Sequence, residues 1–99
     1  METFSELIQS ETLVLVDFYA DWCGPCKAME PIVKDVAKTI NGKARIIKIN
    51  IDQSEAAARA YDVNAVPTFI LFRKGKILWR HPGMIDKAAL LAVLNQHAS

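Results

Sequence analysis

Cysteine is scarce in this sequence, because only Cys23 and Cys26 are present among its 99 residues. Two thiols cannot form the disulfide framework of a small secreted domain, and a bridge between such close neighbours closes too small a loop to act mainly as a stabiliser. A structural zinc ion usually needs four ligands, and the two histidines, His81 and His97, do not form a spaced pair. The pattern argues against a disulfide scaffold and predicts no metal site. Two packed core thiols remain an alternative.

An excess of one charge and a long apolar run are also missing. The 12 basic and 11 acidic residues leave a net charge of +1, and the basic residues are dispersed, so we expect no nucleic-acid partner. No apolar run approaches the length of a membrane span, so we expect no membrane partner. The first 12 residues carry three glutamates and no basic residue, unlike a secretory signal. We expect a cytoplasmic protein; a periplasmic or secreted location stays open if Met1 replaces a removed signal peptide.

Hydrophobic residues make up 52% of the chain, enough for one domain over residues 1–99 with its own core. Apolar patterns predict strands at 13–20, 44–51, 68–72 and 76–80, and helices at about 4–10, 25–40, 54–61 and from Asp86 onward. Helical crossovers favour parallel strands, and the Lys74-Gly75 turn favours an antiparallel hairpin. The sequence therefore predicts an α/β fold with a mixed four-stranded sheet flanked by helices, a βαβ unit followed by a ββα unit.

The two cysteines lie between a predicted buried strand and a predicted helix. Pro25 favours the first turn of that helix, because its missing N–H would have no partner there. The free N–H groups and the positive end of the helix dipole favour an anion nearby, so Cys23 should ionise more readily than an ordinary cysteine. Cys26 lies one turn further along and should be the more buried thiol. This asymmetry predicts that Cys23 attacks a partner's disulfide and that Cys26 resolves the mixed disulfide.

Three features of the sequence closely resemble the thioredoxin family over nearly the whole chain. They are the segment Trp-Cys-Gly-Pro-Cys-Lys at positions 22–27 after a buried strand, Pro31 inside the following helix, and Val66-Pro67-Thr68 before the hairpin. The resemblance implies a thioredoxin fold and a protein-disulfide reductase that uses Cys23 as the attacking thiol and Cys26 as the resolving thiol. It also implies a cis bond before Pro67, which composition could not have suggested because such bonds are uncommon.

Asp17 matches the family's buried carboxylate behind the resolving cysteine. A carboxylate inside a strand covered on both faces loses its hydration, so its pKa should be raised. Such a group could take the proton of Cys26, directly or through one water. A purely structural role for Asp17 is the alternative. Lys48, on the neighbouring strand, matches the family's lysine partner for this acid, although a strand lysine is usually a solvated charge.

The resemblance also implies a set of partners. The docking surface for disulfide-containing proteins would consist of Trp22, Gly24, Pro25, Ala65, Val66, Pro67, Gly83 and Met84. An extended substrate segment would pair with the backbone of Val66 as an added strand. Electrons would come from NADPH through a separate thioredoxin reductase, with no cofactor bound to this chain, and the protein would be a monomer.

Two departures from the family pattern are visible. Tyr19 replaces a tryptophan common in bacterial thioredoxins and keeps an aromatic plate at this position. The chain also begins too late to supply the usual strand before the first helix, so the strand at 44–51 should have an open edge. Lys43, Arg45 and Lys48 lie along that edge and discourage pairing between molecules. Lower stability or an edge-to-edge dimer stays open.

Two other functions also stay open at this point. A thiol oxidant or isomerase on the same fold is one of them, but such proteins usually carry other residues between the cysteines, often with a histidine. Gly24 and Pro25 favour a reductant. A redox-independent binding or scaffold subunit, which would use the surface around Trp22, is the other.

Overall fold

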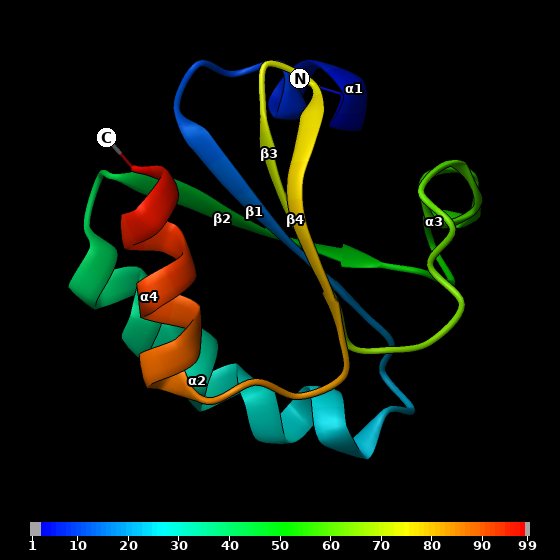
Figure 1. Ribbon diagram of the computed structural model, residues 1–99. Helices are drawn as coiled ribbons and strands as arrows, with labels where there is room; N and C mark the ends of the chain where they lie inside the picture. The colour runs from blue at the N-terminus through cyan, green and yellow to red at the C-terminus, as the bar shows by residue number, and fades with distance from the viewer. Residues whose placement is uncertain (1–2, 99) are drawn as a thin grey trace.

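The computed structural model describes residues 3–98 and places four helices and four strands in that range (Figure 1). In chain order they are α1 (Phe4–Ile8), β1 (Leu13–Tyr19), α2 (Gly24–Ile40), β2 (Ala44–Asn50), α3 (Glu55–Ala60), β3 (Thr68–Arg73), β4 (Lys76–Pro82) and α4 (Lys87–His97). The types and the order of these elements are those predicted from the sequence, and their ends differ from the predicted ones by one or two residues. Each helix in this range is too short or too polar to serve as a membrane span.

The strands form one mixed sheet in the order β2-β1-β3-β4, so β2 is an edge strand, as predicted. β1 and β2 are parallel and joined by α2, whereas β3 runs antiparallel to both β1 and β4. The prediction that each helical crossover joins parallel strands is therefore wrong for α3.

The register of β3 gives the physical reason. Thr68, at the start of β3, pairs with Phe18 near the end of β1. The chain therefore returns to the sheet at the end where β1 and β2 terminate. α3 has six residues and spans only about 9 Å. A strand of seven residues, such as β2, is about 23 Å long, so this short helix does not carry the chain back along it.

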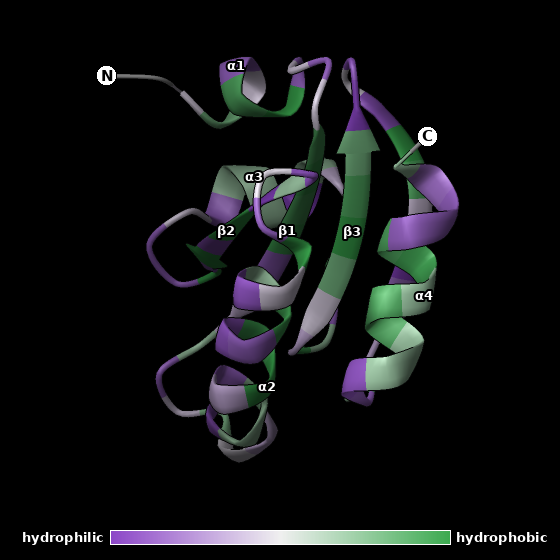
Figure 2. Ribbon diagram, turned by 90° about the vertical axis from the view of Figure 1, so that its left-hand side faces the viewer, coloured by the Kyte–Doolittle hydropathy of each residue, from purple (hydrophilic) through white to green (hydrophobic). Residues whose placement is uncertain are grey.

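Helices cover both faces of the sheet. Figure 1 shows α2 and α4 together on one face and α1 and α3 on the other. The core under α2 and α4 includes Leu13, Leu15, Met29, Val36, Phe69, Leu71, Leu90 and Leu94. The core on the opposite face includes Ile8, Val14, Val16, Phe18, Ile70 and Phe72. Because successive residues of β1 and β3 alternate between two apolar cores, both strands are hydrophobic along most of their length (Figure 2).

Candidate active site

The two cysteines form a disulfide at the N-terminus of α2. Cys23 is the N-cap residue and Pro25 lies in the first turn of the helix, as predicted. The backbone N–H of Cys26 donates to Sγ of Cys23 over 3.1 Å, so this sulfur accepts one of the N–H groups that a helix start leaves without a partner. The Cα atoms of the two cysteines are 5.2 Å apart, within the ordinary range for a disulfide. The structure therefore places Cys23 where a negative charge on its sulfur is favoured.

The predicted difference in burial between the two cysteines is wrong. Cys23 is 4% exposed and Cys26 is 5% exposed. Cys23 is covered because its Sγ lies 3.5 Å from the carbonyl oxygen of Val66, on the loop before β3. The bond between Val66 and Pro67 is cis, as the resemblance implied. The asymmetry between the two sulfurs therefore rests on the helix N-terminus and not on the exposed area of the residues.

Asp17 lies in the middle of β1 and is 3% exposed. Because side chains alternate along a strand, it points to the same face as Leu15, the face that α2 covers. Burial raises the pKa of Asp17 to about 6, the Lys48 cation opposes the rise, and the Glu30 anion adds to it. Its Oδ1 atom has no hydrogen-bond partner among the described residues. The predicted direction of the pKa shift is confirmed, and burial is its main cause.

Lys48 is the residue of β2 that pairs with Asp17 in the sheet register. Its ammonium lies 3.7 Å from Oε1 of Glu30, on α2, and 4.4 Å from the ring centroid of Tyr19. Lys48 lowers the pKa of Asp17 as a nearby cation, so the two residues are coupled electrostatically. The ion-pair partner of the Lys48 ammonium is Glu30, which the sequence did not indicate.

The proposed docking residues surround the disulfide in three segments, at 22–25, 65–67 and 83–84. Trp22 and Met84 are the large exposed apolar side chains of this set, with 69% and 50% of their surfaces exposed. The N–H of Gly83 donates to the carbonyl of Pro67 over 2.7 Å and ties two of the segments together. Gly24, Pro25 and Ala65 are exposed, Val66 and Gly83 are half-buried, and Pro67 is buried. The structure thus brings all eight predicted residues to one end of the sheet.

Sequence reasoning missed the polar residues that hold Trp22. The indole Nε1 donates to Oδ2 of Asp52 over 2.8 Å. The side chain of Asn50 contacts both neighbouring segments, because its amide donates to Asp21 and its carbonyl oxygen accepts the N–H of Asp52. One available signal could have found them. β1 and β2 are parallel, so the residues that follow each strand meet at the same end of the sheet.

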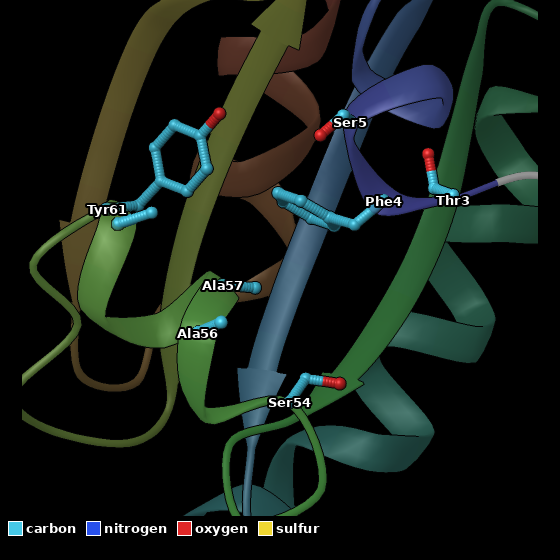
Figure 3. A pocket seen from close by; sticks show the side chains of 8 residues that line it. Thr3, Phe4, Ser5, Ser54, Ala56, Ala57 and Tyr61 are labelled. Carbon is cyan, nitrogen blue, oxygen red and sulfur yellow. The ribbon is translucent and has the colours of Figure 1, made fainter.

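A pocket of about 500 Å³ lies away from the cysteines, between α1 and α3. Figure 3 shows the rings of Phe4 and Tyr61 next to each other in the lining of this pocket, with Ala57 beneath them. The two rings pack edge to face with their centroids 5.6 Å apart. None of the lining residues belongs to the motif or to the docking segments. Within residues 3–98, no group of three or more His, Cys, Asp or Glu side chains is placed to hold a metal ion.

Comparison with known proteins connects this site to one family. Residues 1–96 match the family described as Thioredoxin. The chain is 37% identical to a thioredoxin of Rickettsia conorii, over 92% of this chain and 87% of the relative. It is 43% identical to a thioredoxin of Chlamydia pneumoniae, over 98% and 93% of the two chains.

Solved structures agree with the sequence relatives. A mutant thioredoxin from Halobacterium salinarum superposes with a TM-score of 0.87 at 37% identity, covering 100% of this chain and 88% of the other. Mitochondrial thioredoxin 3 of Saccharomyces cerevisiae, in its oxidised form, gives a TM-score of 0.84 at 32% identity, covering 94% and 86%. With its two cysteines at disulfide distance at a helix N-terminus, this chain belongs to the thioredoxin family and is a thiol–disulfide oxidoreductase that reduces protein disulfides.

Proposed function

We propose that Cys23 is the attacking thiol of the reaction. The observation that carries this proposal is the hydrogen bond from the N–H of Cys26 to Sγ of Cys23 at the N-terminus of α2. In the reduced protein the same N–H stabilises the Cys23 thiolate. The thiolate attacks one sulfur of the substrate disulfide, a bond forms between Cys23 and that sulfur, and the other substrate sulfur leaves as a thiolate.

Cys26 then resolves the mixed disulfide. Asp17 takes the proton of the Cys26 thiol, directly or through one water, and the resulting thiolate attacks Sγ of Cys23. The Cys23–Cys26 disulfide forms, and the second substrate sulfur leaves and is protonated. Two electrons have passed from the cysteine pair to the substrate, and the first leaving thiolate takes its proton from solvent, in place of the one that Cys23 released on ionising. The position of Asp17 on the face covered by α2, together with its pKa of about 6, supports this role.

Substrate proteins dock on the eight residues around the disulfide. Trp22 and Met84 offer apolar surface, and the half-buried Val66 offers its backbone to an extended segment that carries the substrate disulfide. The hydrogen bond from Trp22 to Asp52 holds the indole in place. We further propose that the protein works as a monomer in the cytoplasm. A separate thioredoxin reductase that uses NADPH returns the disulfide to the dithiol.

Equilibration with glutathione tests the direction of the reaction. A reductant has a potential below that of the glutathione pool, and about 30 mV corresponds to a tenfold change in the ratio of the two forms. In a buffer poised at the potential of the glutathione pool, we expect the disulfide form to exceed the dithiol form at least roughly tenfold. Acid quenching and alkylation of the free thiols measure the ratio. A protein found mainly as the dithiol in this buffer would act as an oxidant or isomerase instead.

A further inference from the structure

Glu30 joins two elements next to the proposed proton acceptor. It lies in α2, seven positions after Cys23 in the sequence, and its Oε1 atom is 3.7 Å from the ammonium of Lys48 in β2. Both side chains are half-exposed, with 47% of Glu30 and 42% of Lys48 open to solvent, so the pair lies at the surface. Asp17, the register partner of Lys48, is buried beneath it.

The ring of Tyr19 makes a second contact with the same ammonium. The ring lies two residues after Asp17 on the same strand and therefore on the same face, and its centroid is 4.4 Å from Nζ of Lys48. An aromatic face attracts a cation, so Glu30 and Tyr19 together fix the end of a side chain that would otherwise be flexible. Glu30 and Tyr19 thus hold the Lys48 ammonium, which is the charge on β2 that acts on Asp17.

Two charged groups of the described residues act on Asp17. β2 contributes Lys48, α2 contributes Glu30, and the residue opposite on β3 is the apolar Phe69. The Lys48 cation favours the ionised carboxylate and the Glu30 anion disfavours it, which agrees with the effect of each on the pKa of Asp17. The ion pair between them partly neutralises the cation that would otherwise make Asp17 a weaker base.

We propose that Glu30 is a positioning residue for the resolving step, which binds the Lys48 ammonium at the surface and so keeps Asp17 able to accept the proton of Cys26. The inference rests on the proposed function of Asp17. No atom of Glu30 enters the reaction. Glu30 acts on Asp17 directly as a nearby anion and also through Lys48, the cation that it binds, and the positioning role is the second of these effects.

Titration of the Asp17 carboxyl carbon by NMR in the oxidised protein tests this inference without turnover. Glu30→Gln should lower the pKa of Asp17 by about half a pH unit, the size expected for a partly screened charge. Lys48→Gln should raise it. In the Lys48→Gln background, Glu30→Gln should have less than about half of its effect in the wild type, because the shared cation is gone.

Glu55→Gln is the matched control, because Glu55 pairs with Arg59 over 3.6 Å on the exposed face of α3. This variant should leave the titration of Asp17 unchanged. If Glu30→Gln moves the pKa of Asp17 no more than Glu55→Gln does, the inference is wrong. An effect of equal size with and without Lys48 would also overturn it, since Glu30 would then act only as a nearby anion and not through the lysine.

A kinetic measurement separates this inference from the proposed function. The rate of resolution is followed as release of the second thiol from a mixed disulfide on Cys23, across the pH range around the pKa of Asp17. In Glu30→Gln, the midpoint of the acid limb of the pH profile should shift to lower pH by the same amount as the pKa of Asp17. A shifted titration with an unmoved profile would overturn Asp17 as the base. A moved profile with an unshifted titration would overturn the role of Glu30.

Discussion

Cys26→Ser is expected to turn the protein from a reductase into a trap. Cys23 keeps its place at the N-terminus of α2 and still forms a mixed disulfide with a substrate. The hydrogen bond to its sulfur comes from the backbone N–H of residue 26, which serine also supplies. Without an internal thiol, release depends on thiol from solution, so reduction of insulin should slow by at least about a thousandfold, in keeping with the effective concentrations of intramolecular groups. Non-reducing electrophoresis and mass spectrometry detect the trapped partner.

Cys23→Ser is the matched variant of this experiment. It removes the attacking thiol, so it should neither reduce insulin nor hold a partner. If Cys23→Ser traps partners and Cys26→Ser does not, the assigned order of attack is reversed. If Cys23→Ser retains full biological function, the chain works as a redox-independent binding subunit and its chemistry is incidental.

Asp17→Asn is expected to stabilise the protein by about 3 kcal/mol near pH 7. The pKa of Asp17 is about 6 in the folded protein and 3.8 without its burial, so the two states differ by roughly two pH units, each worth about 1.4 kcal/mol. Asparagine has the same shape without the charge. Because Oδ1 of Asp17 has no hydrogen-bond partner among the described residues, the substitution breaks no hydrogen bond at that atom.

The pH dependence of this gain has a definite sign. Between about pH 4 and 6 the folded protein keeps a proton on Asp17 that the unfolded chain has released, so the stability of the wild type falls as the pH rises through this window. Below about pH 4 both states are protonated and the gain from Asp17→Asn should vanish. Urea unfolding of the oxidised proteins at several pH values measures it. If Asp17→Asn still stabilises the protein in acid, or destabilises it near pH 7, burial of a charged carboxylate is not the cause of the raised pKa.

Asp35→Asn is the control for this stability experiment. Asp35 lies on the exposed side of α2, where its carboxylate accepts a hydrogen bond from Lys87 over 3.0 Å. An exposed ion pair contributes at most about 1 kcal/mol, so this variant should change the stability little and in the opposite direction. Asp17→Asn should also slow the resolving step, because the acceptor of the Cys26 proton is gone. Higher stability with slower chemistry is the combined signature of a buried catalytic base.

Much of this fold follows from local patterns in the sequence. Apolar runs mark the strands because two cores flank the sheet, and Pro25 marks the start of α2 next to the cysteines. The raised pKa of Asp17 could also be predicted from its position, since any carboxylate inside such a strand loses hydration. The cis bond before Pro67 followed only from the family resemblance, because no local pattern specifies it.

The remaining features depend on contacts between segments that are distant in sequence. The antiparallel course of β3 depends on where the chain re-enters the sheet after α3. The presence of a helix between two strands does not by itself decide this. The near-equal burial of the cysteines depends on the loop that carries Val66. Glu30 looks like an ordinary charge on a helix surface until α2 and β2 are packed together and Lys48 lies beside it. Such residues are found only once the elements are placed in space.

The central claim is that the N-terminus of α2 makes Cys23 the reactive sulfur of the pair. Alkylation of the reduced protein by iodoacetamide, with the modified residue identified by mass spectrometry at a series of pH values, measures this directly. We predict that Cys23 reacts at least about tenfold faster than Cys26 near pH 7, with a thiol pKa clearly below the ordinary value of about 8.5. Equal rates for the two thiols, or a faster reaction at Cys26, would contradict the account.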